Sequence, residues 1–315
     1  LLSSPWALAQ NYPNKSIKFI VPFPAGSATD NVGRILAQAM GEALGQSITI
    51  ENKAGANGIL GAEAVKSSPA DGYTFLVTTS TTQAANVHLY RKLSYDPVKD
   101  FTPIGKVGET GFILMVNSDF PAKDMKEFIS YAKANPGKLN YGSSGSGGSP
   151  HMTMEMFKLR SGTDITHVPF RGAGPMLVEV VAGRLESGCD NMPSCIGHIR
   201  DGRLRALAVT SNVRAAALPD VPTLAEAGIR DFEATAWFGV QAPSRTPRPI
   251  IERLGAEIDV ITRDPAYIAR IAELGGAPPA LTSAGGTSPE SFDAFIRSEI
   301  TKWAEVVKVS GATVD

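Results

Sequence analysis

The sequence KSIKFIVPFPAGSATDNVGRILAQAMGEAL, residues 15–44, decides the fold class of this chain. Apolar and polar side chains alternate over Lys15–Val21, a pattern typical of a β-strand, and Pro22–Ser27 ends the strand. The next residues predict an amphipathic helix whose apolar stripe consists of Val32, Ile35, Leu36, Ala39, Met40 and Leu44. Ser27 or Thr29 is expected to cap this helix.

The following residues repeat the same unit. Strand patterns cover Ile48–Glu51 and Tyr73–Thr79, and a short helix is expected between them at Gly58–Ser67. The order is therefore βαβαβ. This order predicts a largely parallel sheet with right-handed crossovers.

Between Asp96 and Gly111 the pattern is interrupted by prolines and glycines, and we place a first crossing between domains there. A second α/β set follows, with strands expected at 112–116, 165–170, 185–189 and 204–210 and helices at 123–134, 175–182 and 196–199. A short helix near 224–227, a strand at 236–241 and helices at 249–262, 265–274 and 288–309 complete the chain. These last helices are expected to pack on the first domain.

The pattern predicts an α/β protein of two lobes, in which each mainly parallel or mixed sheet is flanked by helices. We assign residues 10–105 and 233–315 to lobe 1 and residues 106–232 to lobe 2. Two crossings between lobes form a hinge, and a cleft between α/β lobes is a natural site for a small molecule.

Composition excludes two classes of partner. Lys and Arg number 30 against 31 Asp and Glu, so the formal net charge is -1 and no basic surplus exists for nucleic acid. No apolar run reaches the roughly 20 residues of a membrane helix. Residues 1–9, LLSSPWALA, have the pattern of the end of a signal peptide cleaved after Ala9, which predicts export; a disordered or tag-derived start is the alternative.

The chain has two cysteines, Cys189 and Cys195. We expect buried structural thiols, and whether they form a disulfide in an exported protein stays open. Two thiols without a histidine pair at ligand spacing make a poor metal site, so neither a metal nor a cofactor is expected.

The sequence NYGSSGSGGSPHMTMEMF, residues 140–157, predicts a glycine-rich loop that leads into a helix. Ser149 suits the N-cap and Pro150 the first turn. Such a helix start favours an anion. His151 on its first turn is expected to donate a hydrogen bond to a ligand, and a structural role as partner for nearby backbone is the equal alternative. A flexible linker is the alternative, although regular patterns continue into both flanks of the loop.

Small polar loops also follow strands at residues 24–30, 79–82, 170–174 and 190–191. The carboxyl ends of strands face the crevice in open α/β sheets, so these loops are expected to converge. Their Ser, Thr, Gly and Asn residues offer neutral donors to a carboxylate. Arg171 is the cationic candidate, and an ordinary surface arginine is the equal alternative. Asp190 is expected to face water or a polar end of the ligand.

Enzyme motifs are largely absent. The sequence contains no complete P-loop, GxGxxG fingerprint, GxSxG elbow, HExxH or CxxC, and we expect no catalysis. A periplasmic serine hydrolase, with Ser146 or Ser149 as nucleophile and His151 as base, is the alternative from another class.

Several segments together match a known family. They are PFPAGSATD at 22–30, NKAGANG at 52–58, DGYT at 71–74, YGSSG at 141–145, VPFRG at 168–172, RALAVT at 205–210 and LPDVPT at 218–223. In this order the chain resembles the Bug-type solute receptors of tripartite tricarboxylate transporters. The resemblance covers nearly the whole mature chain.

The resemblance implies a monomeric periplasmic receptor with the two-lobed, type II-like periplasmic binding protein fold. Such a receptor closes on a small organic acid, for example a dicarboxylate or an aromatic carboxylate, and presents it to membrane permease subunits; a role as a ligand-sensing partner in signalling is the alternative. The family pattern and its motif positions place ligand contacts at Phe23, Ala25, Gly26, Ser27, Ser80, Thr81, Thr82, Ser144, Gly145, Ser146, Gly147, Ser149, His151, Arg171, Gly172, Asp190 and Asn191.

Overall fold

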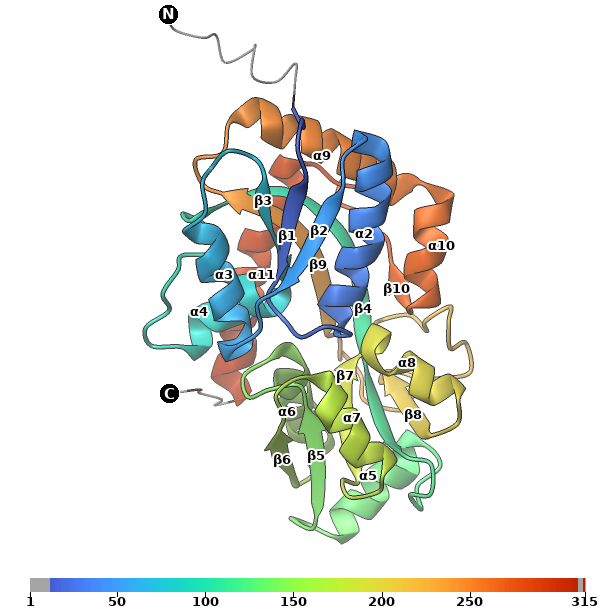
Figure 1. The fold of residues 1–315 in the computed structure, drawn as a ribbon. Helices are drawn as coiled ribbons and strands as arrows, with labels where there is room; N and C mark the ends of the chain where they lie inside the picture. The colour runs from blue at the N-terminus through green and yellow to red at the C-terminus, as the bar shows by residue number, and fades with distance from the viewer. Residues whose placement is uncertain (1–11, 311–313, 315) are drawn as a thin grey trace, which may run out of the picture.

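A continuous mixed sheet runs through the computed structural model, which describes residues 12–310 and Val314 (Figure 1). The strand order is β2-β1-β3-β9-β4-β7-β5-β6, and β8 and β10 also pair with β4. The strands are β1 (Ile17–Val21), β2 (Ile48–Asn52), β3 (Thr74–Thr79), β4 (Phe101–Asn117), β5 (Leu139–Ser143), β6 (Ile165–Pro169), β7 (Ser187–Asn191), β8 (Leu204–Val209), β9 (Thr235–Pro243) and β10 (Gly276–Ala277).

Helices cover both faces of this sheet (Figure 1). They are α2 (Ala28–Leu44), η1 (Ala56–Gly58), α3 (Ile59–Lys66), η2 (Thr81–Ala85), α4 (Asn86–Leu89), α5 (Met125–Ala134), α6 (Ser149–Ser161), α7 (Ala173–Val181), α8 (Met192–Arg200), α9 (Arg248–Arg263), α10 (Pro265–Glu273) and α11 (Pro289–Ser310). The predicted βαβαβ start is confirmed, since β1 pairs in parallel with both β2 and β3.

The residues of α2 explain why it forms where it does. The Ser27 side chain accepts a hydrogen bond from the Asp30 N–H at the helix start, and Gly45 ends the helix with φ 65°. Its predicted apolar stripe is buried against β1 and β3, apart from Ala39, which is partly exposed. The loop between β1 and α2 is therefore anchored by the strand at one end and by the capped helix at the other.

Strand β4 is longer than the sequence predicts and joins the two halves of the sheet. Residues 101–111 were expected to be irregular, but they pair antiparallel with β9. The register shifts between Pro103 and Gly105 and between Lys106 and Gly108, so bulges accommodate residues that otherwise interrupt a strand.

The far end of β4 belongs to the second half of the molecule. Phe112–Asn117 pairs antiparallel with β7 and β8, while β7, β5 and β6 run parallel to one another. The chain returns to the first half through β9, giving the two-lobed arrangement seen in Figure 1. At Gly111–Phe112, strand β4 changes its pairing partner from β9 to β7. The lobe boundaries at residues 105 and 232 stay predictions.

The predicted helix at 224–227 is wrong. Thr223 and Glu226 exchange side-chain to backbone hydrogen bonds in the manner of a capping box. The turn that they close ends at Gly228, whose φ is 100°. The sequence therefore contains a helix-start signal but not enough residues for a helix to continue.

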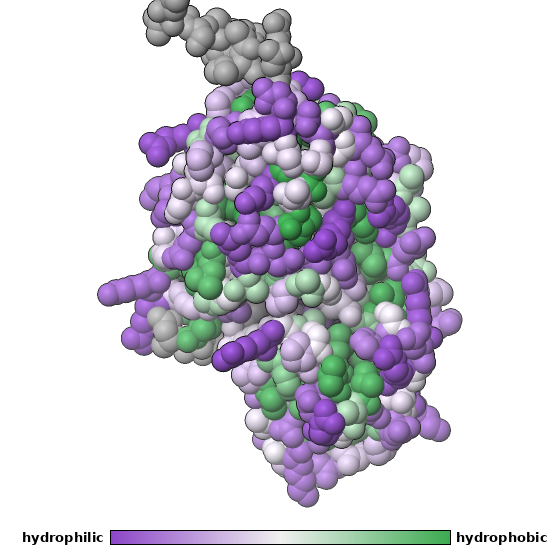
Figure 2. Space-filling model, in the orientation of Figure 1, coloured by the Kyte–Doolittle hydropathy of each residue, from purple (hydrophilic) through white to green (hydrophobic). Residues whose placement is uncertain are grey.

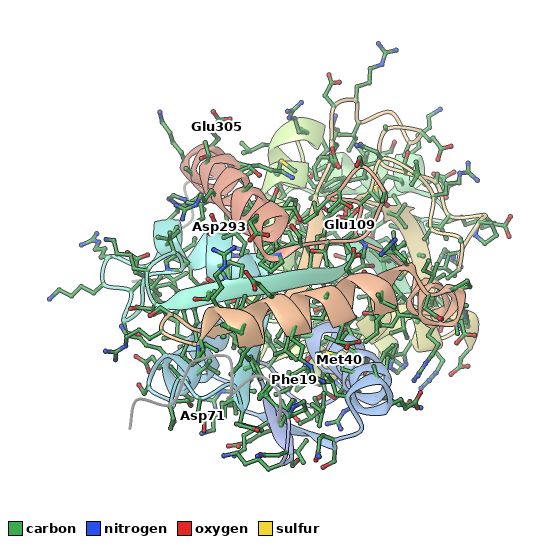
Figure 3. All side chains as sticks on the ribbon, turned by 90° about the horizontal axis from the view of Figure 1, so that it is seen from above. Phe19, Met40, Asp71, Glu109, Asp293 and Glu305 are labelled. Atoms are coloured by element: carbon green, nitrogen blue, oxygen red, sulfur yellow. The ribbon has the colours of Figure 1, made fainter. Side chains whose placement is uncertain are left out.

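The C-terminal helices pack on the first half, as predicted, and α11 also reaches the second. Seen from above, α9 lies along β4 (Figure 3). Helix α11 contacts β4, η2 and α6, and Trp303 shares a buried apolar cluster with Leu89 of α4 and Met152 of α6. One helix thus supports both sides of the junction between the halves.

Both cysteines are buried and free in the structure. Burial raises the pKa of each thiol well above its usual value, which favours the unreactive protonated form. The predicted signal sequence lies outside the described residues. Among the described helices, none has the length and apolar character to cross a membrane.

Candidate functional site

A narrow cleft, with a cavity volume of about 40 Å³, lies where the two halves meet. In the space-filling view, the outline narrows along this junction (Figure 2). One wall comes from the first half and the other from the second. The lining residues are Phe23, Pro24, Ser27, Ala28, Thr29, Asn57, Thr79, Ser80, Thr81, Ala236 and Phe238 on one side, and Ser144, Gly148, Ser149, Pro150, Gly172, Ala173, Asp190, Asn191 and Ser194 on the other.

The starts of four helices, α2, α6, α7 and α8, line this cleft. Only α2 has a side-chain cap among them; α6, α7 and α8 begin at Gly148, Gly172 and Asn191 without one. Uncapped helix starts carry partial positive charge and leave backbone N–H donors, although at α6 the Ser149 N–H already donates to Thr81 Oγ1 and Pro150 has no N–H. The arrangement favours an anionic group in the cleft.

The prediction of Ser149 as an N-cap is wrong, because Gly148 holds that position. The Ser149 hydroxyl instead lies 2.8 Å from the Thr81 hydroxyl and 3.1 Å from the Ser80 hydroxyl. The Ser149 N–H also donates to Thr81 Oγ1 at 3.3 Å. These bonds join the loop after β3 to the start of α6 across the cleft.

Asp30 braces the first loop rather than facing a ligand. Its Oδ2 accepts from the Gly26 N–H and from Arg34 Nε, both at 2.9 Å, and its Oδ1 accepts from Asn52 Nδ2 at 2.9 Å. Burial raises the pKa of this carboxyl, but the three donors outweigh burial and hold the pKa below its usual value. The loop that carries Phe23 is therefore held rigidly at the mouth of the cleft.

Asn57 is a cleft residue that the sequence did not single out. It has φ 51°, a left-handed conformation that is uncommon for a residue other than glycine. Its side-chain amide donates to the Ser146 carbonyl of the glycine loop and to the Tyr90 hydroxyl. A strained residue that bridges the two walls is typical of a functional position.

Asp190 and Asn191 end β7 on the opposite wall. Asp190 is 1% exposed, and its Oδ1 accepts from the Asn191 N–H at 2.7 Å and from Asn191 Nδ2 at 3.2 Å. Burial raises the pKa of Asp190 to about 6, although nearby Ser144, Asn191 and Ser194 act to lower it. Asp190 is the one charged side chain among the described residues that line this cleft.

His151 lines neither the cleft nor the adjoining pocket, and it has the structural role that was the alternative to ligand contact. Its Nδ1 accepts from the Gly147 N–H at 2.9 Å, and its ring stacks on His167 with centroids 3.9 Å apart. Burial is the main cause of a lowered pKa for His151, which keeps the ring neutral. The histidine therefore shapes the glycine loop instead of touching a ligand.

The predicted serine–histidine pairs are not formed. Ser149 bonds to Ser80 and Thr81, and His151 bonds to Gly147. Ser143 Oγ lies 2.7 Å from His167 Nε2, but Ser143 is fully buried and neither residue lines the cleft. The geometry does not support the hydrolase hypothesis.

The predicted site residues divide into three groups. Those that line the cleft are Phe23, Ser27, Ser80, Thr81, Ser144, Ser149, Gly172, Asp190 and Asn191. An adjoining pocket, which shares several of these residues, adds Gly145, Ser146 and the exposed Arg171. Neither pocket is lined by Ala25, Gly26, Thr82, Gly147 or His151.

Of the predicted residues that line neither pocket, Thr82 forms its side-chain hydrogen bonds within its own half. The Thr82 hydroxyl bonds to Thr78 and Thr79 of its own half. Thr29, Thr79 and Ser194 line the cleft but were not predicted individually, although Thr29 and Thr79 fall inside the predicted loops. In the described part of the chain, no group of three or more metal-ligating side chains gathers.

Comparison with known proteins identifies the family. The model of the tripartite tricarboxylate transporter family receptor matches residues 32–311. The chain belongs to this family. The receptor is 36% identical to protein BugT of Bordetella pertussis over 305 residues, which covers 96% of this chain and 92% of BugT.

Solved structures of similar proteins carry the same fold. Rpa4515 of R. palustris with adipate superposes with a TM-score of 0.91 at 35% identity, covering 96% of this chain and 99% of that one. The periplasmic binding protein BugD superposes with a TM-score of 0.88 at 32% identity, covering 96% of this chain and 99% of BugD. MatC (Rpa3494) from Rhodopseudomonas palustris with bound malate superposes with a TM-score of 0.85 at 34% identity, covering 94% of this chain and 100% of MatC.

Proposed function

We propose that this receptor captures a small organic acid in the cleft between its lobes and releases it without making or breaking a bond. The observation that carries this proposal is the convergence of four helix starts and several neutral hydroxyl donors on one cleft. Oriented N–H and O–H donors hold a carboxylate well in a site shielded from water. The adipate and malate bound by two similar receptors support this class of ligand.

Capture is proposed to proceed by hinge closure. Bonds between Thr81 and Ser149, between Asn57 and Ser146, and from Asn31 Nδ2 to the Pro193 carbonyl join the two walls. A ligand that touches both walls favours the closed form through its differential affinity. Micromolar binding corresponds to roughly -8 kcal/mol, which several such hydrogen bonds and an enclosed carbon chain supply.

Export and delivery complete the proposal. Residues 1–9 are proposed to be the end of a signal peptide cleaved near Ala9, which places a monomeric receptor in the periplasm. There it hands its ligand to the permease subunits of a tripartite tricarboxylate transporter. The family to which the chain belongs supports this assignment over signalling.

A calorimetric titration of purified receptor with a panel of dicarboxylates, aromatic acids and amino acids tests the proposal. We expect saturable binding of at least one acid at a one-to-one ratio. The same preparation is incubated with esters of the acid that binds, and no turnover is expected from wild type. Turnover that Ser149→Ala abolishes, or the absence of binding by every acid, would sink the proposal.

A further inference from the structure

Two stacked histidines lie behind the glycine loop between β5 and α6, and neither lines the cleft or the adjoining pocket. The rings of His151 in α6 and His167 in β6 are nearly parallel, at 12°, with centroids 3.9 Å apart. Each ring contacts a different end of the loop through one nitrogen. Between these contacts, the loop lines the cleft and the adjoining pocket with Ser144, Gly145, Ser146 and Gly148.

The contact at the far end of the loop fixes the tautomer of His151. Its Nδ1 accepts a hydrogen bond from the Gly147 N–H at 2.9 Å, so a neutral ring carries its proton on Nε2. That Nε2 lies 3.9 Å from Oε1 of Glu155, whose carboxylate also accepts from the Tyr141 hydroxyl and from Lys158 Nζ. A proton on Nδ1 would remove the acceptor and release the Gly147 peptide.

The contact at the near end fixes the tautomer of His167. The Ser143 hydroxyl has one proton, and the Gly145 carbonyl, 3.0 Å from Ser143 Oγ, can only accept it. His167 Nε2 lies 2.7 Å from the same Ser143 Oγ, so both contacts are hydrogen bonds only when His167 Nε2 is a donor. Tyr141 also stacks on His167, with ring centroids 4.8 Å apart, and limits rotation of the imidazole.

The surroundings keep both rings uncharged. Burial is the main cause of the lowered pKa of each histidine; Glu155 opposes it at His151, while Lys158 adds to it at both rings and His151 adds to it at His167. Two neutral rings can stack at this distance, whereas two imidazolium ions would repel each other. The stack and both loop contacts therefore require the same protonation state.

The backbone held between the two contacts takes part in closure. The Ser146 carbonyl accepts a hydrogen bond from Asn57 Nδ2 of the first half, and Gly148 is the N-cap of α6. Gly145 and Gly147 have φ values of 154° and 73°, which glycine adopts readily. A loop so rich in glycine has many accessible conformations, so its neighbours must select one.

We propose that His151 and His167 act as one positioning pair, in which two neutral rings protonated on Nε2 hold the glycine loop in the shape that binds an acid. The proposal rests on the proposed function and goes beyond it, because neither ring touches the acid. His151 directs the Gly147 peptide, and His167 anchors the turn at Ser143 and Gly145. Both rings affect ligand affinity through the backbone between them.

Variants of His151 separate the role of its ring nitrogen from that of the ring itself. An asparagine Oδ1 lies close to the place of Nδ1, so His151→Asn keeps an acceptor for the Gly147 N–H, whereas His151→Ala removes it. The full receptor is titrated calorimetrically with malate, aspartate, adipate and benzoate. For an acid that binds wild type, the affinity is expected to fall at least about tenfold in His151→Ala and to stay within about threefold in His151→Asn.

His198→Ala is the matched control, because His198 lies near the end of α8 and lines neither pocket. Its affinity is expected to equal that of wild type. A role in stability alone would lower the melting temperature of His151→Ala without separating its affinity from that of the control.

A double-mutant cycle tests whether the two histidines act together. His167→Leu removes the donor to Ser143, whereas His167→Gln keeps a donor near the place of Nε2. If the rings form one unit, the loss of affinity in the variant that combines His151→Ala and His167→Leu is smaller than the product of the two separate losses. A loss equal to that product would mean that the two contacts are independent, and the inference of a pair would be wrong.

The tautomers are measured on wild type, so this test does not depend on the folding of any variant. Long-range ¹H–¹⁵N correlation spectra of the imidazole nitrogens at pH 7 are expected to show both rings neutral, with the proton on Nε2. A proton on Nδ1 of either ring overturns the inference.

The outcomes separate this inference from the proposed function. Wild-type affinity in folded His151→Ala, or equal losses in His151→Ala and His151→Asn, overturns the inference and leaves the proposed function standing. Absence of binding by wild type for these four acids and for the wider panel overturns both.

Discussion

The hydroxyl oxygens of Thr81 and Ser149 lie 2.8 Å apart, although the residues stand 68 positions apart in the chain. Thr81 follows β3 in the first half, and Ser149 begins α6 in the second. Both side chains are buried, so this contact exists only when the halves are together. The contact between Thr81 and Ser149 is therefore a marker of the closed arrangement of the two halves.

Removal of this contact is expected to weaken ligand binding. Thr81→Val keeps the shape of the side chain but removes its hydroxyl, and a net hydrogen bond contributes about 1 kcal/mol, or roughly fivefold in affinity. Thr166→Val on the exposed surface of β6 is the control. Isothermal titration with an acid that binds wild type gives the comparison; equal affinities in both variants would show that the contact does not support closure.

Asn57 is expected to hold the closed state. Asn57→Gly tolerates the positive φ but removes the amide that bonds to Ser146 and Tyr90. Asp231→Gly is the matched control, because Asp231 also has a positive φ of 54° and is exposed.

The radius of gyration of each variant, measured by small-angle X-ray scattering without ligand, is expected to rise in Asn57→Gly and to stay at the wild-type value in Asp231→Gly. The affinity of Asn57→Gly for an acid is expected to fall about tenfold, since two hydrogen bonds are lost. A wild-type radius together with wild-type affinity in Asn57→Gly would contradict this role.

Gly147 is expected to tolerate no side chain. Its φ is 73°, and a Cβ there would lie 2.4 Å from Val314 and 3.2 Å from both Asn57 and Leu89. Gly147→Ala therefore combines backbone strain with a steric clash. Gly202→Ala is a strict control, because Gly202 has φ 70° and open space around it.

The melting temperature is expected to fall by roughly 3 °C or more in Gly147→Ala relative to Gly202→Ala, and the variant is expected to bind an acid at least about tenfold more weakly. Gly147→Val extends the same test with a larger side chain. A binding affinity equal to that of Gly202→Ala would mean that the glycine loop has no special place in the site.

The local pattern of the sequence predicted most strands and helices, because their apolar spacing depends on near neighbours. It did not predict the first part of β4, where Pro103, Gly105 and Gly108 are typical of a loop. The strand forms because β9 supplies a partner that lies more than a hundred residues away, and bulges absorb the irregular residues. Tertiary pairing overrides local preference there.

The candidate site was predicted at the level of loops but not of side chains. Convergence of the strand ends follows from the topology, and Ser80, Thr81 and Asp190 line the cleft; their contact with a ligand stays a prediction. The role of Asn57 depends on a contact with Ser146, 89 positions away. His151 was misplaced for the same reason, because β6 brings His167 against its ring.

The stacked histidines predict a loss of stability in acid. Burial lowers the pKa of His167 to about 3, with His151 and Lys158 adding to the effect. In the unfolded chain the pKa is near 6.5, so below that pH the unfolded state binds more protons and stability falls as pH falls toward 3. Asp190, with its pKa raised to about 6, acts in the opposite direction between pH 6 and its usual pKa.

The variant His167→Gln isolates this contribution, since glutamine does not titrate and leaves Asp190 in place. Between pH 7 and pH 5, the melting temperature of wild type is expected to fall by a few degrees more than that of His167→Gln, measured by scanning fluorimetry at constant ionic strength. Between pH 8 and pH 9 both histidines are neutral in the folded and the unfolded state, so the two curves should run in parallel. Parallel curves down to pH 5 would show that His167 takes up a proton as easily in the folded receptor as in the unfolded chain.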